Sequence, residues 1–217
     1  MKQFKNHHTA FTMIELVMVI VVLGILASLA MPRLDRDTTQ EASDIVLSNI
    51  RYTQHLALMD YKHDFDTPAW QQRLWKIDFA SCSGSTGFFM RVGSDMDNGG
   101  AIGKEEAALD PITGKPLYWI TSSECSKGGD ETVSQNVFLS YRFGVEDITA
   151  TGGCNQHIAF DHLGRPHVGI LTATTPTYAT YMDTTCTLTF TMSSGDTFAI
   201  KIEPETGYAY IDGQEES

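Results

Sequence analysis

The chain has few cysteines, little positive charge and a single long apolar run. Four cysteines in 217 residues are too few for a miniprotein built on many disulfides. Fifteen Lys and Arg against 27 Asp and Glu give a formal net charge of −12, which excludes the overall basic surface of a nucleic-acid binder. Because the chain has only one long apolar run, it is not a membrane protein with several spans. The hydrophobic content of 42% excludes a disordered chain, and the length allows one or two domains with a core.

Sequence motifs of enzymes are also missing. The chain has no G-x-S-x-G, no H-E-x-x-H and no Gly-rich phosphate loop. Four residues that could form a metal or acid–base site cluster in the sequence, namely His157, Asp161, His162 and His167. A surface hairpin that contains histidines is the favoured interpretation of this cluster. We therefore expect no enzymatic activity.

Residues 11–31 are apolar except for one charge, Glu15. A helix of this length spans roughly 30 Å, the thickness of a bilayer core. A secretory signal peptide cut after Ala30 and a plain membrane anchor are two interpretations, and the length argues against a buried core helix. Neither of the first two explains Glu15, because a carboxylate inside an apolar span costs about 2.5 to 3.5 kcal/mol and requires a partner.

The segment Ala10-Phe11-Thr12-Met13-Ile14-Glu15, followed by the apolar run, resembles the class III signal of type IV pilins and type II secretion pseudopilins. The resemblance implies that a prepilin peptidase cuts between Ala10 and Phe11 and that the new amine of Phe11 is methylated. Ala10 stands where the family usually has Gly. Removal of the leader also removes Lys2 and Lys5, so the net charge changes to −12 − 2 = −14.

The resemblance further implies how such a chain assembles. In a filament, the amine of Phe11 would pair with Glu15 of a neighbouring subunit, which supplies the missing partner for the buried carboxylate. Gly24 and Pro32 fall where pilins carry residues that weaken the helix. We expect them to let the span bend when it leaves lipid for a filament.

The organisation that follows has four segments. Residues 1–10 are a cytoplasmic leader and residues 11–32 a transmembrane and filament-core helix. An amphipathic spine helix is expected over 33–62, and a β-rich globular periplasmic domain over 63–217. The protein would therefore cross the inner membrane once and then enter a filament.

Helical periodicity continues beyond the apolar run, and short β-type runs follow it. The helical positions expected to face a sheet are Ala42, Ile45, Val46, Ile50, Leu56 and Ala57. The expected strands are 74–80, 88–92, 117–120, 137–143, 157–160, 186–192, 197–202 and 208–211. Hairpin loops at 193–196 and 203–207 make the last three strands a meander. The predicted fold is α+β, a long N-terminal helix packed on an antiparallel β-sheet domain.

Three patches are similar to the minor pseudopilin GspH and the related FimT group. They are the helical RYTQHLAL at 51–58, the strand and turn IAFDHLGRP at 158–166, and the closing TGYAYI at 206–211. This resemblance implies a two-sheet globular domain.

The four cysteines all lie in the expected periplasmic domain, which is an oxidising compartment. Their wide spacing matches no zinc pattern, because zinc sites need close pairs. Two disulfides can form in three connectivities. We favour Cys82–Cys125 and Cys154–Cys186, because each pair joins segments that are neighbours in the strand order. Free buried thiols are the alternative.

Residues 95–106 resemble an EF-hand calcium loop. Alternate oxygens would converge on one Ca²⁺ ion, Gly100 permits the sharp turn at the sixth place, and the last carboxylate closes the shell. Gly99 stands where the EF-hand has an oxygen-bearing side chain. The expected ligands are Asp95, Asp97, the carbonyl of Ala101 and Glu106. An acidic, Gly-rich surface turn is the alternative.

The function expected from the resemblance is that of a structural subunit in a type II secretion pseudopilus or a type IV pilus. Its implied partners are other pilin subunits, the prepilin peptidase and an inner-membrane assembly platform driven by a cytoplasmic ATPase. One alternative is a minor pilin at the fibre tip that binds a surface or DNA, the latter through a basic groove around Arg142, Lys127 and Arg91. Another is a secreted or anchored periplasmic protein that is cleaved elsewhere.

Overall fold

The structure is a computed structural model that describes residues 12–83, 87–125, 128 and 131–214, with the backbone alone for 28–37. The chain divides into two compact units, Met1–Asp37 and Thr38–Ser217. The second unit, called the globular domain below, contains all the strands.

A single helix, α1 (Met13–Met59), runs through both units. It continues through Gly24 and Pro32, and no atom outside the helix lies within 4 Å of a Cβ built on Gly24. The helix ends at Met59, whereas the sequence placed the end of the spine helix at residue 62. Asp60 follows the last turn, and its carboxylate accepts a hydrogen bond from the Trp75 indole at 2.9 Å. This contact directs the chain from the helix toward the first strand.

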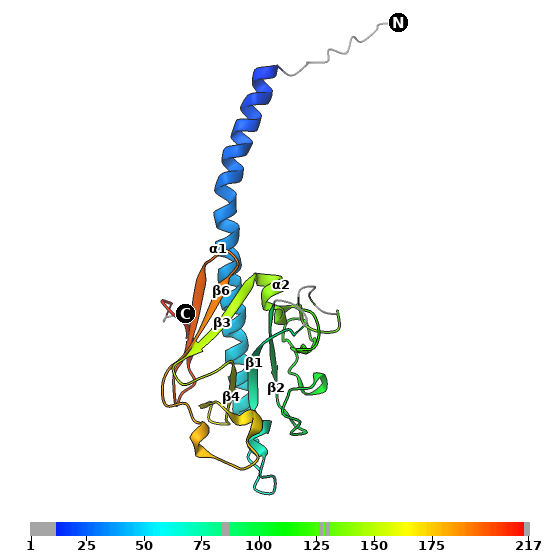
Figure 1. Ribbon diagram of the computed structural model, residues 1–217, viewed down its shortest axis with the longest axis vertical. Coiled ribbons are helices and arrows are strands. Elements are labelled where there is room, and N and C mark those ends of the chain that lie inside the picture. Colours follow the sequence, from blue (N-terminus) through cyan, green and yellow to red (C-terminus); the bar gives the residue numbers. More distant parts are fainter. Residues whose placement is uncertain (1–11, 84–86, 126–127, 129–130, 215–217) are drawn as a thin grey trace. The chain divides into compact units, whose positions relative to one another are not determined.

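Two four-stranded antiparallel sheets make up most of the globular domain (Figure 1). The first sheet has the order β2-β1-β4-β5 and the second the order β3-β6-β7-β8. The strands are β1 (Trp75–Ser81), β2 (Phe88–Gly93), β3 (Val145–Thr151), β4 (His157–Phe160), β5 (Pro166–His167), β6 (Cys186–Met192), β7 (Thr197–Ile202) and β8 (Ala209–Ile211). The short helices are η1 (Trp70–Arg73), η2 (Lys104–Glu106), η3 (Gln135–Val137), α2 (Leu139–Phe143), η4 (Ile170–Thr172) and η5 (Tyr178–Thr180).

The part of α1 that belongs to the globular domain lies in one core with both sheets. Four of the six helical positions predicted to face a sheet are fully buried, namely Ala42, Val46, Ile50 and Ala57. The other two, Ile45 and Leu56, are partly buried against the same core. Phe79 of β1 and Phe190 of β6 meet edge to face at 5.4 Å, which links the two sheets. The α+β fold predicted from the sequence is confirmed.

Two predicted strands are absent from the described residues, and two strands, β3 and the short β5, were missed. Residues 137–143 form the end of η3 and then α2, because Leu139 and Phe143 are buried one helical turn apart. Gly144, at φ 77°, ends this helix. The strand β3 follows at once, although its buried positions do not alternate. Residues 117–120 form no strand, although the Val92 amide of β2 donates a hydrogen bond to the Leu117 carbonyl and Trp119 packs against the cluster that contains Phe89.

The predicted closing meander is confirmed, because β6, β7 and β8 pair in sequence order. Its strands alternate buried and less buried positions, as expected for a sheet with one face on the core. Leu188, Phe190, Ile200 and Ile202 point into that core.

The structure contains the two disulfides favoured by the chain order. Cys82–Cys125 joins the end of β1 to the segment before α2, with 5.9 Å between the Cα atoms. Cys154–Cys186 joins the loop after β3 to the start of β6, with 5.4 Å between the Cα atoms. The first pair is buried beside Phe89 in a small cluster of its own.

Candidate functional site

The predicted processing site, Ala10 and Phe11, lies outside the described residues. The helix α1 starts at Met13, two residues after Phe11. The Glu15 amide donates to the Thr12 side-chain oxygen at 3.3 Å, which satisfies one of the free amides of the first turn. The Glu15 side chain is exposed, and within the described part of the chain no cationic group forms an ion pair with it.

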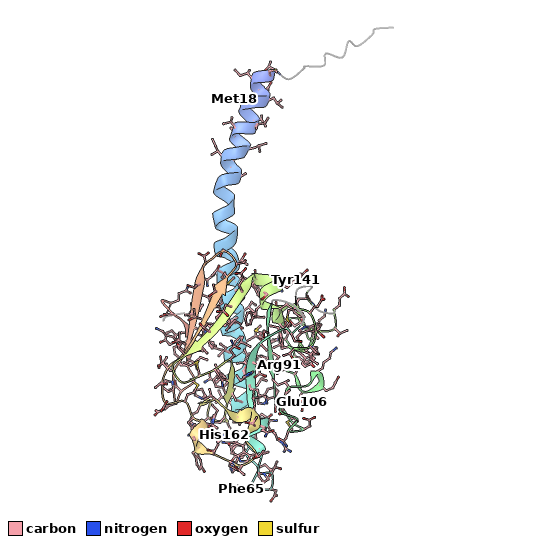
Figure 2. All side chains as sticks on the ribbon, in the orientation of Figure 1. Met18, Phe65, Arg91, Glu106, Tyr141 and His162 are labelled. Atoms are coloured by element: carbon pink, nitrogen blue, oxygen red, sulfur yellow. A yellow bond between two sulfur atoms is a disulfide. The ribbon has the colours of Figure 1, made fainter. Side chains whose placement is uncertain are left out.

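The first turns of α1 expose apolar side chains on every side. Met18, labelled in Figure 2, is 64% exposed. A helix that is apolar all round is normally covered by protein or lipid. Among the residues that the structure describes, no helix is both long and apolar enough to cross a membrane. The exposed apolar residues are Met13, Ile14, Leu16, Val17, Met18, Val19, Ile20, Val21, Val22, Leu23, Ile25 and Leu26.

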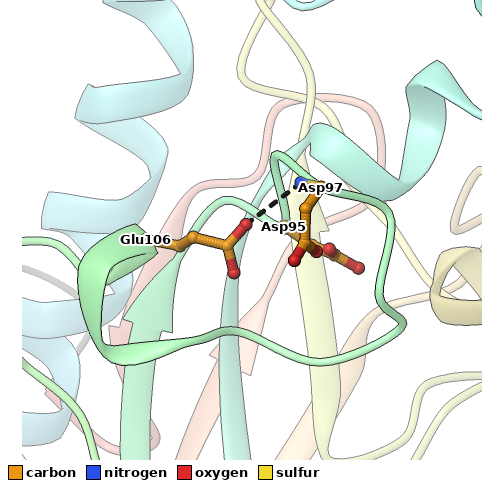
Figure 3. Close-up of side chains that lie close together, drawn as sticks. All are labelled: Asp95, Asp97 and Glu106. Carbon is orange, nitrogen blue, oxygen red and sulfur yellow. Dashed lines mark hydrogen bonds between the residues drawn. The ribbon is translucent and has the colours of Figure 1, made fainter.

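The predicted calcium loop brings its three carboxylates together (Figure 3). One oxygen atom from each of Asp95, Asp97 and Glu106 lies within 4.8 Å of the others. Gly100 has φ 84°, a conformation that suits glycine, as the sharp turn requires. Ala101, the fourth expected ligand, is exposed on the same loop. The spacing therefore predicted which side chains meet, and calcium binding itself stays a prediction.

Backbone amides of the same loop already bind these carboxylates. The Gly99 and Gly100 amides donate to the two oxygens of Asp95, both at 2.9 Å. The carboxylate of Glu106 accepts the amides of Met96 and Asp97 at 2.7 and 3.1 Å on one oxygen, and that of Gly103 at 2.8 Å on the other. The carboxylates of Asp95 and Glu106 are thus already hydrogen-bonded to backbone amides of the loop itself.

A lysine supplies a positive charge at the same place. The ammonium of Lys76, a β1 side chain only 1% exposed, lies 3.7 Å from Asp95 Oδ2 and donates to the Gln72 carbonyl at 3.1 Å. Burial raises the pKa of Asp95, and the charge of Lys76 opposes that effect. The carboxylate oxygens of this loop are therefore the type of ligand that a divalent cation prefers. A bound cation would nevertheless compete with Lys76 and with the backbone amides for these oxygens.

We expect calcium to stabilise the globular domain by about 1 kcal/mol or less at millimolar concentration, because of this competition. Thermal unfolding of the full chain with and without calcium measures the effect, and magnesium is the ion control. Asp97→Asn is the matched variant, because it removes one charge and retains an acceptor for the Gly99 amide. A stabilisation of several kcal/mol that this variant abolishes would show a tight site instead.

A buried polar network on the first sheet was missed from the sequence. Asp78 of β1 is fully buried, and its Oδ2 accepts a hydrogen bond from Arg91 Nε of β2 at 3.0 Å. His157 Nδ1 of β4 lies 3.1 Å from the other oxygen. His157 and Arg91 hold the pKa of Asp78 below its ordinary value, although burial alone would raise it. The network joins three strands at one point, so its role is to position the sheet.

The histidines that cluster in the sequence separate in the structure. His157 faces Asp78, whereas His162 packs against the Tyr61 ring at 4.5 Å, near the end of the domain that carries Phe65 (Figure 2). His167 is buried, with Nδ1 2.9 Å from the Thr180 hydroxyl. No metal group of three or more His, Cys, Asp or Glu residues involves these histidines within the described residues.

Asp161 organises the turn that follows β4. Its carboxylate accepts hydrogen bonds from the Leu163 and Arg165 amides and forms an ion pair with the Arg165 guanidinium at 2.6 Å. His167, whose Nε2 lies 3.5 Å from the carboxylate, and the hydrogen bonds of Arg165 hold the pKa of Asp161 well below its usual range, against the opposing effect of burial. These contacts hold the shape of the turn between β4 and β5.

The predicted basic groove is not assembled in the described part of the chain. Arg91 is buried against Asp78, and Arg142 forms an ion pair with Glu41 at 3.0 Å and a hydrogen bond with Asn136. Lys127 lies outside the described residues. The two described arginines are thus neutralised by nearby carboxylates, which argues against DNA binding at this place.

Comparison with known proteins gives one match. The prokaryotic N-terminal methylation motif matches residues 5–31, and no curated protein or solved structure matches the chain. Proteins with this motif are structural rather than catalytic, interact with other pilin subunits and with prepilin peptidase, and are membrane-anchored filament subunits. The matched segment contains Ala10, Phe11 and Glu15, so the chain carries the N-terminal methylation motif that is the signature of type IV pilins and pseudopilins.

Proposed function

We propose that this protein is a structural subunit of a type II secretion pseudopilus or a type IV pilus, assembled through the N-terminal part of α1. The observation that carries the proposal is the methylation motif at residues 5–31, followed by a helix that exposes apolar side chains all round. Such a helix is stable only where lipid or other apolar helices cover it. The membrane before assembly and the filament after it both provide that cover.

In this proposal, Glu15 fixes how far neighbouring subunits are shifted along the filament relative to one another. A cut between Ala10 and Phe11 creates an α-amino group four residues before Glu15. The amine of one subunit would pair with the Glu15 carboxylate of its neighbour, since an unpaired carboxylate among apolar helices is costly. The helix would cross the inner membrane before assembly, with the globular domain in the periplasm, where the two disulfides can form.

Within this class we favour a minor pseudopilin similar to GspH and FimT. One long helix packed on two antiparallel sheets agrees with that choice, as does the closing meander that ends in β8. The globular domain would cover the outside of the filament.

Intact mass and N-terminal sequencing of the protein from native membranes test the proposal. We expect a chain that begins at Phe11 and carries one methyl group. Reduction should add two hydrogens for each of the two disulfides. The reason is that prepilin peptidase reads the motif before the apolar run, whereas signal peptidase reads small residues after it.

Ala30→Leu serves as the control variant. It alters the small-residue site at Ala30 that fits a signal peptidase, so the chain should still begin at Phe11 if the cut lies before that residue. A chain that starts at Met31, and a block of that cut by Ala30→Leu, would contradict the filament subunit and favour a secreted protein. An uncut chain would favour a plain anchor.

A further inference from the structure

A hollow in the globular domain, remote in sequence from the N-terminal motif, carries unpaired negative charge. It has a volume of about 400 Å³ and is lined by Arg165, Tyr181, Met182, Asp183 and Glu205. Three segments form it, namely the turn before β5, the segment before β6 and the loop between β7 and β8. We propose that this hollow receives a basic side chain, preferably an arginine, from a different protein chain.

The charges of the lining residues favour a cation. The guanidinium of Arg165 is already neutralised by the buried Asp161 at 2.6 Å, and it donates a second hydrogen bond to the Tyr181 hydroxyl at 2.8 Å. Asp183 and Glu205 are exposed, and among the described residues neither forms an ion pair. The hollow therefore presents two free carboxylates, and a guanidinium can bind carboxylates through paired hydrogen bonds.

Aromatic side chains beside the hollow favour a protein partner. Arg165 lies 4.5 Å from the centre of the Tyr181 ring, which shows that a guanidinium packs well on this wall. Tyr178 stacks parallel to Tyr181 with 6.4 Å between ring centres and is 86% exposed. Tyrosine and arginine are enriched where interfaces gain most of their binding energy. An exposed tyrosine stacked on a lining residue thus offers contact area to the surface that would present the basic side chain.

The backbone at Glu205 has an unusual conformation. Glu205 has φ 63°, and among the described residues only Asn98 shares a positive φ without being glycine. Asparagine tolerates this conformation, whereas glutamate does so poorly. Glu205 follows Pro204 in the tight loop that the Gly207 amide closes by donating to the Glu203 carbonyl at 3.0 Å. The positive φ of Glu205 places its carboxylate at the edge of the hollow.

The net negative charge of this chain favours a partner that is a different protein rather than a second copy. This chain has a net charge of −12, and a second copy would bring a like-charged surface to the two carboxylates. The inference does not depend on processing at Phe11. It can fail while the filament function holds, and the reverse is also true.

The test uses the full chain in detergent and a short acetylated Gly-Arg-Gly peptide, followed by NMR at low ionic strength. We expect saturable shifts at Tyr181 and the residues around it. The same peptide with citrulline, which is neutral and has the same shape, should cause none. The double variant Asp183→Asn, Glu205→Asn should bind at least roughly tenfold more weakly. The control Asp147→Asn, which changes an exposed carboxylate on β3, should bind as the native chain does.

The unfolding temperature of a variant distinguishes a loss of binding from a loss of folding. Because asparagine tolerates a positive φ, Glu205→Asn should unfold at the same temperature as the native chain or higher while it weakens binding. Equal shifts with the citrulline peptide, unchanged binding in the double variant, or no saturation with the arginine peptide would each overturn the proposal.

Discussion

Removal of either disulfide is expected to lower the free energy of unfolding of the globular domain by about 4 kcal/mol, because each cross-link closes a long loop in the unfolded chain. The linked residues are 43 and 32 positions apart. A domain of this size is stable by only about 5 to 15 kcal/mol, so loss of both cross-links should leave it close to unfolding. Urea unfolding of the full chain, with the pairs Cys82→Ala, Cys125→Ala and Cys154→Ala, Cys186→Ala, measures each effect.

Alanine is the appropriate replacement, because a serine hydroxyl at the buried Cys82, Cys125 or Cys186 would add a cost of its own. Chemical reduction of the native chain is the matched control, since it breaks the bonds without changing the sequence. If each pair of substitutions costs less than about 1 kcal/mol, the unfolded chain is already constrained and this entropic account is wrong.

Replacement of Asp78 by asparagine is expected to cost about 3 to 5 kcal/mol of unfolding free energy, because it leaves buried positive charge without its partner. Arg91 and Lys76 both lie on the same face of the first sheet as Asp78 and are almost completely buried. The amide has nearly the same shape as the carboxylate, so packing changes little. Asp147→Asn, on the exposed part of β3, should change stability by less than about 0.5 kcal/mol.

Asp78 also makes the free energy of unfolding depend on pH, and the direction of this dependence follows from its pKa. The pKa of Asp78 is lower in the folded protein than its ordinary value. Its stabilising contribution is therefore complete above the unfolded-state pKa of about 3.9 and is lost as the pH falls through the folded-state pKa. Urea midpoints measured from pH 6 to pH 2 should fall less steeply for Asp78→Asn than for the native chain. Parallel slopes would contradict the assignment.

A double-mutant cycle with Arg91→Met isolates the ion pair. If Asp78 and Arg91 stabilise each other directly, the double variant should be less destabilised than the sum of the single variants. Additive effects would mean that Lys76 and His157, rather than Arg91, compensate most of the charge of Asp78.

Local patterns in the sequence accounted for the features that depend on neighbouring residues. The apolar run and Glu15 predicted the motif that matches residues 5–31. The helical spacing of Ala42, Val46 and Ile50 predicted which face of α1 is buried, because side chains three and four residues apart share a face. The spacing within residues 95–106 likewise predicted that Asp95, Asp97 and Glu106 would meet.

Sequence patterns failed to predict the secondary structure where a short segment could form either a helix or a strand. Residues 137–143 are rich in apolar side chains that suit a strand, and only the burial of Leu139 and Phe143 on one side made them helical. The strand β3 was missed because Glu146 and Asp147 are both exposed, which breaks the alternation that marks a strand. In both places packing overrode a weak local preference.

The sequence by itself therefore determined the N-terminal motif, the long helix and the closing meander, and it favoured the cysteine pairing that the structure contains. Only the tertiary structure decided that Asp78, Arg91 and His157 meet, since they come from β1, β2 and β4 and their encounter depends on strand register. It also decided that Asp183 and Glu205 border one hollow. The physical reason is that a local repeat can be counted along the chain, whereas contact between distant segments depends on how the whole core packs.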